Sequence, residues 1–175
     1  LITTGTIFRK NISEHTMLGE LAEGFLKQGK LVPDAITNEV VQNRLKEKDC
    51  AVGFILDGYP RNITQAIFLD TFVFLTHAVF VFLPDEIVYE RVSKRLMCRC
   101  GESYHLVTKP PKKSGICDVC GQSLFQRVDD TPEVLKVRLE SYHANIEPVL
   151  LHYKEQGVWH EVDGAKSVPE VREAI

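Results

Sequence analysis

The sequence predicts an α/β fold, in which a parallel β-sheet is flanked by helices, with a small metal-binding insert. Two runs, residues 51–56 (AVGFIL) and 78–83 (AVFVFL), are continuously apolar, as expected for strands that are buried on both faces. Amphipathic helical patterns separate these runs, which favours parallel strands connected by helices. Four cysteines, two pairs with sixteen residues between them, interrupt the alternation and indicate the insert.

The first half of the chain predicts the end of a strand followed by three helices. Residues 1–2 are typical of the end of a strand, which leads into Thr3-Thr4-Gly5. Apolar residues at helical spacing then predict a helix around residues 7–12 and a second from about 16 to 28, which Gly29 ends. Pro33-Asp34 begins a third helix that continues to about residue 45.

The second half continues this alternation. The run 51–56 leads into DGYPR (residues 57–61), with a helix from about residue 62, and the strand 78–83 precedes a helix that begins at Pro84-Asp85. DTPE (residues 130–133) has the proline and acid of a helix start. Residues 158–162 predict a last strand, and a closing helix follows from Ser167. Ligands of parallel sheets bind at the carboxyl ends of strands. In this chain, residues 3–5, 57–61 and 163–166 are expected at such ends.

Composition excludes several classes of protein. The 175 residues (19.8 kDa, 44% apolar) are enough for one domain with a small insert, and a net charge of 21 − 24 = −3 gives no general attraction to nucleic acid or to an anionic membrane. Five cysteines, four of them at metal-ligand spacing, favour a reducing compartment. The chain shows no signal-peptide pattern and no apolar run of membrane-spanning length. We therefore expect a soluble intracellular protein.

The four-cysteine segment predicts a zinc site. Two cysteine pairs separated by 15–20 residues are typical of zinc ribbons, since each pair supplies two sulfur ligands. The first pair is C-x-C, one residue shorter than usual, and the second is C-x₂-C. Four reduced structural thiols are the alternative. The predicted ligands are Cys98, Cys100, Cys117 and Cys120.

Arginines flank this segment on both sides. Arg91 and Arg95 precede the cysteines on one predicted helix, and Arg127 and Arg138 follow them. The planar guanidinium group matches phosphate oxygens two at a time, so the group of arginines suggests an anionic ligand. For any one arginine, a surface salt bridge is the simpler interpretation.

Ordered motifs along the whole chain carry a family resemblance. TGTIFR, GKLVPD, GFILDGYPRNITQA, KPPKKSGICDVCG, FQRVDD, VRLESYH and VDGAKSV are similar to segments of the adenylate kinases of the long form with a zinc-binding lid. The resemblance implies a P-loop nucleoside monophosphate kinase fold and the Mg²⁺-dependent reaction ATP + AMP = 2 ADP. It also implies a monomer in the cytoplasm, or in an organelle such as the mitochondrial matrix, with no nucleic-acid or membrane partner. The lid would be residues 96–127, and the core 1–95 and 128–175, with an AMP-binding helical segment at about 5–35.

The resemblance assigns an AMP site. Arg9 and Arg61 match the family's phosphate-binding arginines, and Gln65 matches its adenine-reading glutamine, a side chain that can donate and accept hydrogen bonds together. The complete AMP-binding set that the resemblance implies is Thr4, Arg9, Leu31, Val32, Gly58, Arg61, Gln65, Arg127 and Arg138.

The resemblance also assigns the donor side and the catalytic groups. The catalytic set is Arg95, Arg127, Arg138 and Asp57, with Asp57 ordering water on Mg²⁺, and the ATP-binding set is Arg91, Arg95, Tyr104, His105, Gly164 and Lys166. His105 is equally consistent with a surface or packing histidine. Asp129 and Asp130 match acidic residues at the lid hinge.

Three departures from the family pattern leave a second function open. Thr6 stands where the family usually has aspartate, the stretch 69–78 is shorter, and no G-x-x-x-x-G-K loop is present. We expect the working protein to have an amino-terminal βα segment of roughly 30 residues that carries this loop. The alternative is a non-catalytic, adenylate-kinase-like nucleotide-binding or assembly subunit. The retained phosphate-facing arginines favour the enzyme, because a subunit without catalysis has no chemical need for all of them.

Overall fold

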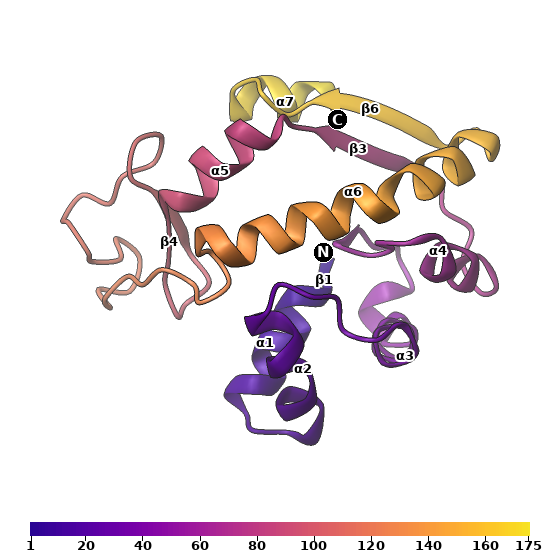
Figure 1. Cartoon of the computed structure of the whole chain (residues 1–175), viewed down its shortest axis with the longest axis horizontal. Helices are drawn as coiled ribbons and strands as arrows, with labels where there is room; N and C mark the ends of the chain where they lie inside the picture. The colour runs from indigo at the N-terminus through magenta and orange to yellow at the C-terminus, as the bar shows by residue number, and fades with distance from the viewer.

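A computed structural model describes all 175 residues. The long helix α6 (Pro132–Glu155) crosses the middle of the molecule and contacts elements from both halves of the chain (Figure 1). The helix begins where the Thr131 side chain accepts a hydrogen bond from the Val134 amide at 3.4 Å, with Pro132 in its first turn. It continues through Pro148 to Glu155 as one helix.

The amino-terminal part is helical, as predicted. Strand β1 (Ile2–Thr3) leads into helices α1 (Thr4–Ser13), α2 (Met17–Lys27) and α3 (Asp34–Leu45). Their core contains Phe8, Ala22 and Val32. Gly29 ends α2 with φ of +70°, and a Cβ atom there would lie 2.6 Å from the Val134 carbonyl oxygen of α6, so only glycine fits.

The predicted buried strand at residues 51–56 is wrong. The chain forms a 3₁₀ turn, η1 (Lys48–Cys50), and only Leu56–Asp57 is a strand, β2. Val52 and Ile55 are 94% and 68% exposed. Gly53 has φ of +124°, which interrupts an extended run, and β2 pairs with a β1 that is only two residues long. Helix α4 (Ile63–Asp70) follows, close to its predicted start.

The parallel strands form two separate two-stranded sheets. β1 pairs with β2, and β3 (Ala78–Phe82) pairs with β6 (Trp159–Asp163), so the prediction of parallel strands with flanking helices is confirmed. Helix α5 (Asp85–Ser93) follows β3, and α7 (Val168–Ala174) follows β6. The expectation that residues 78–83 are buried on both faces is wrong. Val79 and Val81 are 42% and 46% exposed because they line a cavity of about 660 Å³ beside α5 and α6.

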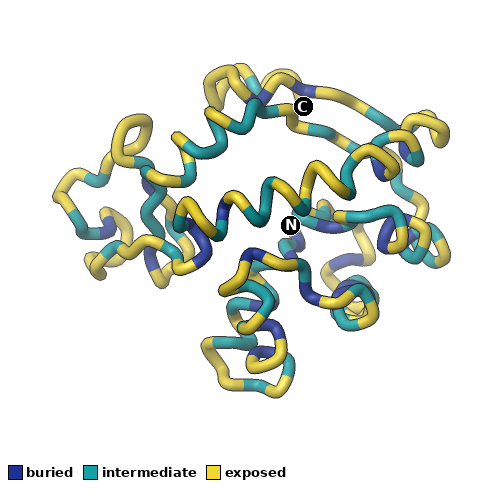
Figure 2. The backbone as a smooth tube through the Cα atoms, in the orientation of Figure 1, coloured by how far each residue is buried: buried dark blue, intermediate teal, exposed yellow.

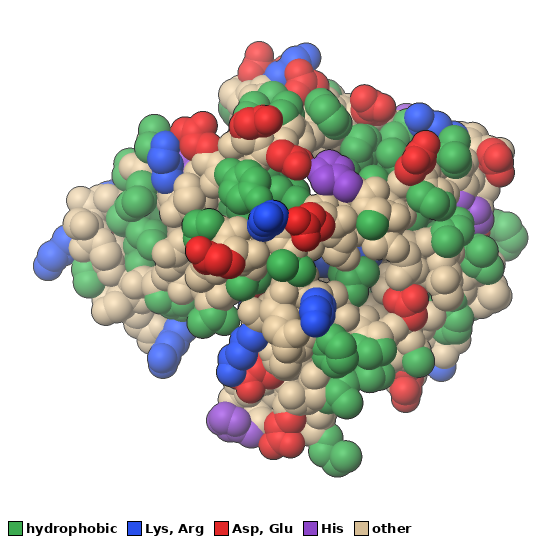
Figure 3. Space-filling model, viewed as in Figure 1, with side chains coloured by type: hydrophobic (Ala, Val, Ile, Leu, Met, Phe, Trp, Pro, Cys, Tyr) green, Lys and Arg blue, Asp and Glu red, His purple; other side chains and the backbone are tan.

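The four-cysteine segment projects from the ends of α5 and α6 (Figure 1). It contains a two-stranded antiparallel sheet of β4 (Arg95–Met97) and β5 (Ser103–His105). Most of its remaining residues are exposed loops, with buried residues near the cysteines (Figure 2). In the space-filling view an indentation separates this segment from the α1–α2 pair (Figure 3). None of the helices combines the length and apolar character needed to cross a membrane.

Candidate functional site

The loop after β2 forms one wall of a pocket beside α1. The Thr4 hydroxyl donates to the Gly58 carbonyl oxygen at 3.0 Å, and Arg61 Nε donates to the same oxygen at 2.7 Å. Gly58 has φ of +73°, and a Cβ atom there would lie 2.8 Å from Arg61 Nη2. The positive φ requires glycine at this position, and Thr4, Gly58 and Arg61 line the pocket together.

Gln65 closes the inner end of the same pocket. Asn62 caps α4 by accepting from the Gln65 amide at 2.9 Å, and the Gln65 side chain is buried, with a residue exposure of 2%. Its Nε2 donates to Asp34 at 2.7 Å, and its Oε1 accepts from the Arg61 backbone amide at 2.8 Å. The predicted AMP-binding residues that line this pocket are Thr4, Leu31, Val32, Gly58, Arg61 and Gln65.

Two adjacent aspartates hold the arginines at the base of the lid. Arg127 donates to both carboxylate oxygens of Asp129, with Nε at 2.9 Å, and Arg138 Nη1 donates to the Asp129 carbonyl oxygen at 3.2 Å. Arg95 Nε donates to Asp130 at 3.0 Å. The Asp130 side chain is fully buried and that of Asp129 is 12% exposed. These two carboxylates therefore hold the guanidinium groups in fixed positions.

The arginines lie close enough to one another for their positive charges to lower each other's pKa values. Burial and, second to it, the positive charge of Arg127 lower the pKa of Arg9 to about 10. Burial also lowers the pKa of Arg61, and the positive charge of Arg138 adds to this shift. The pKa of Arg138 itself is lowered by burial in the same way. Each shift means that the charged form lacks part of its hydration or of its counter-charge. An anionic group placed among these arginines would supply that counter-charge.

On the predicted donor side, Arg91 holds the loop between β6 and α7. Its Nη1 donates to the Gly164 carbonyl oxygen at 2.9 Å, and its Nη2 lies 3.3 and 3.5 Å from the carbonyl oxygens of Ala165 and Lys166. The Gly164 amide donates to Phe82 at 2.7 Å, which anchors the loop to β3. The structure therefore brings together three of the predicted ATP-binding residues, Arg91, Gly164 and Lys166.

His105 lies apart from that loop, on β5 of the lid. Its Nδ1 accepts from the backbone amides of Val107 and Thr108 at 3.2 and 3.1 Å, which fixes the proton on Nε2. That buried Nε2 has no hydrogen-bond partner. Asp57 is exposed at the end of β2, where Thr3 Oγ1 donates to it at 3.5 Å.

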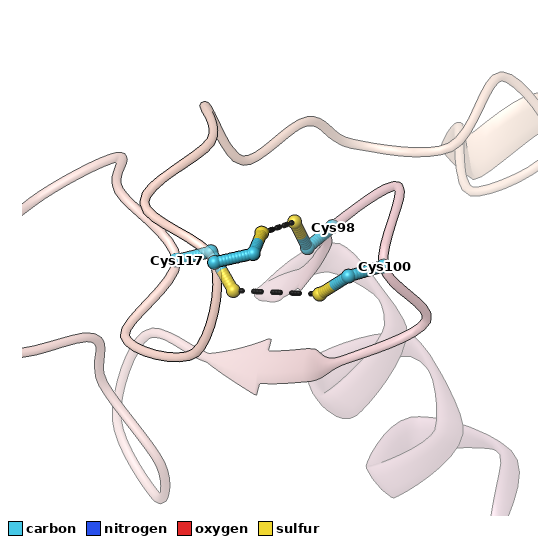
Figure 4. Close-up of side chains that lie close together, drawn as sticks. Cys98, Cys100 and Cys117 are labelled. Atoms are coloured by element: carbon cyan, nitrogen blue, oxygen red, sulfur yellow. Dashed lines mark hydrogen bonds between the residues drawn. The ribbon is translucent and has the colours of Figure 1, made fainter.

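The four cysteine sulfurs meet at one point. They all lie within 4.8 Å of one another, with 3.3 Å between the sulfurs of Cys98 and Cys120 and 3.6 Å between those of Cys100 and Cys117. Tetrahedral zinc with bonds of about 2.3 Å would place its sulfurs about 3.8 Å apart. Cys98 and Cys100 face Cys117 across this point (Figure 4). The donor set fits a metal ion.

Tyr104 supports this cluster from within the lid. Its hydroxyl accepts from the Asp118 amide at 2.7 Å and lies 3.5 Å from Cys117 Sγ. The hydrogen bond from Tyr104 lowers the pKa of Cys117 to about 6, and the same contact raises the pKa of Tyr104 to about 12. A thiolate is the form that ligates metal. Tyr104 was predicted from the resemblance on the donor side, and its hydroxyl lies in the core of the lid.

Sequence reasoning assigned no role to Asp34 or to Asn62. Asp34 was identified only as a helix start, and its contact with Gln65 spans 31 residues of sequence. Two features of the sequence could have indicated this contact: an aspartate directly after Pro33, at the first helical position, and a glutamine at position 65.

Comparison with known proteins identifies the family. The family model described as adenylate kinase matches residues 1–158. Adenylate kinases from Methanosarcina acetivorans and Clostridium beijerinckii are each 44% identical, and that from Methanosarcina barkeri is 46% identical. Each alignment covers 99% of this chain and 83% of the relative. These relatives give no support to the non-catalytic alternative. The chain belongs to the adenylate kinase family, the α/β P-loop nucleoside monophosphate kinases that transfer a phosphoryl group between ATP and AMP with Mg²⁺.

Proposed function

We propose that the pocket lined by Thr4, Arg61 and Gln65 is the AMP site, and that Arg91 with the loop 164–166 forms part of the ATP site. The observation that carries this proposal is the convergence of arginines from separate elements beside the proposed AMP pocket. Arg95, Arg127 and Arg138 are held there by two buried aspartates, and the pKa values of Arg9, Arg61 and Arg138 are all lowered.

This arrangement suits phosphoryl transfer. The transferred group carries charge on its three equatorial oxygens, so catalysis depends on positioning and on neutralisation of charge more than on a protein nucleophile. Arg95, Arg127 and Arg138 would take this role, since Asp129 and Asp130 already hold them in place. Mg²⁺ bound with ATP would neutralise further charge. Asp57 would order water on that ion.

We also propose that the metal of the lid is zinc. Four sulfur ligands are typical of structural zinc sites, and the spacing of the four sulfurs supports this choice. The metal would hold the lid, residues 96–127, as one unit that closes over the bound nucleotides and excludes water. Tyr104 would support the cluster, and His105 would contact the donor nucleotide from the lid. The family resemblance favours a cytoplasmic monomer.

Arg61→Ala tests the site assignment. We expect the KM for AMP to rise by at least tenfold, while the KM for ATP changes by less than twofold, because Arg61 lines the proposed AMP pocket and is not among the residues proposed for the ATP site. Arg172→Ala, in the exposed part of α7, is the control and should change neither constant. Equal losses for both substrates would show that the assignment of the two sites is wrong.

A further inference from the structure

A closed polar network surrounds the side chain of Gln65. Asp34 Oδ1 accepts from Gln65 Nε2 at 2.7 Å, and the Arg61 backbone amide donates to Gln65 Oε1 at 2.8 Å. Asn62 Nδ2 lies 3.0 and 3.1 Å from the two carboxylate oxygens of Asp34, and Asn62 Oδ1 accepts from the Gln65 backbone amide. Residues from the start of α3 and of α4 therefore hold one buried amide.

The chemistry of these partners permits only one orientation of the amide. A carboxylate at neutral pH only accepts hydrogen bonds, and a backbone N–H only donates. If the Gln65 amide turned by 180°, its oxygen would face Asp34 and its NH₂ group would face the Arg61 N–H. Both hydrogen bonds would be lost, and two pairs of like partial charges would be in contact inside a buried site.

The orientation determines what Gln65 offers to a ligand. A glutamine amide has two N–H donors and two acceptor lone pairs. Asp34 accepts from one of the two N–H donors, and the Arg61 amide donates to one of the two lone pairs. One N–H donor and one lone pair of Gln65 therefore remain for a ligand in the pocket, in a fixed order.

That order distinguishes purine bases. Adenine presents an N6 donor beside an N1 acceptor, whereas a 6-oxopurine presents an O6 acceptor beside an N1–H donor. A glutamine amide complements either pattern, but only in opposite orientations, so a locked amide accepts one base and rejects the other.

We propose that Asp34 sets the purine specificity of the AMP site by locking the amide of Gln65. Asp34 is thus a positioning residue, and Asn62 holds it through both carboxylate oxygens. This inference rests on the proposed function, namely that Gln65 contacts the base of the acceptor nucleotide.

Asp34→Asn tests the inference with AMP and IMP as acceptors. An asparagine amide can accept or donate, so a turned Gln65 amide would keep a partner at residue 34 and would lose only the hydrogen bond with the Arg61 N–H. We expect the ratio of kcat/KM for AMP to that for IMP to fall by at least tenfold, through a loss with AMP and a gain with IMP. A merely structural role of Asp34 would lower both values equally, and an unchanged ratio would overturn the inference.

Asp85→Asn is a matched control. Asp85 also follows a proline at the first position of a helix, but it contacts His143 and not the network. The variant loses the same charge at a helix start and should keep the base ratio of the wild type. A ratio that fell equally in this control would overturn the inference, since the charge and not the network would then be the cause.

Two further variants separate the possible failures. Asn62→Ser keeps a hydroxyl that can cap α4 but removes the donors to Asp34, so the ratio should fall by a smaller factor, and an unchanged ratio would overturn the role of Asn62 in the lock. Gln65→Ala tests the proposed function itself. An unaltered KM for AMP in this variant would overturn the site assignment. A large loss there, combined with an unchanged ratio in Asp34→Asn, would overturn only the inference.

Discussion

The acceptor-side segment, residues 1–70, and the lid, residues 96–127, are held in different ways. The acceptor-side segment has apolar clusters around Phe8 and around Val41, and a buried hydrogen-bond network around Gln65. The lid has one small cluster, in which the cysteine sulfurs pack with Tyr104, and most of its remaining residues are exposed (Figure 2).

This difference predicts how each region depends on metal. A segment as small as the lid buries too little apolar surface to be stable by packing alone, and such modules usually need a metal or disulfides. The acceptor-side segment has no comparable need. Removing the metal should therefore disorder the lid and leave the AMP pocket folded, so the two regions can be separated by experiment.

The largest effect is expected from Cys117→Ala. Structural zinc contributes roughly 10–16 kcal/mol in isolated zinc-finger peptides, so losing one of four ligands should remove most of the metal and expose the lid to protease. Phosphoryl transfer should fall at least a hundredfold, because the lid no longer closes. Metal content per chain and the sites of limited proteolysis are the measurements.

Cys50→Ala is the control for this prediction. Cys50 is buried as well, but its sulfur contacts Arg44 on the acceptor side and lies outside the cluster. This variant should retain one metal per chain and a protected lid. Full metal content and wild-type protection in Cys117→Ala would contradict the dependence of the lid on metal.

Asp130→Asn should have the next largest effect, since this fully buried side chain lies at the hinge that the family resemblance implies between the lid and the rest of the molecule. The change leaves Arg95 without its charged partner and should cost about 2–3 kcal/mol, less than for a fully buried pair because the Arg95 side chain is 29% exposed. Urea unfolding measures the loss. Glu140→Gln breaks an exposed pair with Lys136 and should cost under about 0.5 kcal/mol. Equal costs would argue against a fixed hinge.

The sequence predicted the regular and local features well. Helix α2 was expected from about 16 to 28 and spans Met17–Lys27, and the four cysteines that were chosen by spacing lie together. Features that depend on distant contacts were not predictable in this way. The apolar run 51–56 looks like a buried strand, but only Leu56 of this run lies in a strand, and Gly53, with its positive φ, interrupts the run. The lock on Gln65 joins residues 31 positions apart, which no local pattern shows.

The pH dependence of stability should distinguish the hinge from the acceptor side. Burial tends to raise the pKa of Asp129, but hydrogen bonds from Arg127 and the charges of Arg127 and Arg138 lower it overall. Because its folded pKa lies below the unfolded value of about 3.9, Asp129 stabilises the fold above that value and loses this contribution as pH falls through the folded pKa.

Asp129→Asn provides the measurement. The wild type should exceed the variant in free energy of unfolding at pH 6, and this difference should shrink as the pH falls toward 3. Urea unfolding of both proteins across this range tests the prediction. A difference that stays constant with pH would show that the Asp129 charge does not stabilise the hinge.

Apart from the control variants, the smallest effect is expected from Thr16→Ala on the acceptor side. The Thr16 hydroxyl accepts from the Gly19 amide at 3.0 Å and caps α2, so its loss should cost about 1 kcal/mol. Metal content should be unchanged, because α2 does not contact the cysteine cluster. Thermal unfolding and metal content measured together check this, and a lower metal content would mean that the two regions are coupled.

The most direct test is hydrogen exchange measured segment by segment, with and without a chelator that removes the metal. We predict that amides in residues 96–127 lose protection when the metal is removed, while those of α1, α3 and α4 keep it. Loss of protection in both regions, or an unchanged lid, would contradict the proposal that a metal orders the lid and that the chain itself orders the acceptor side.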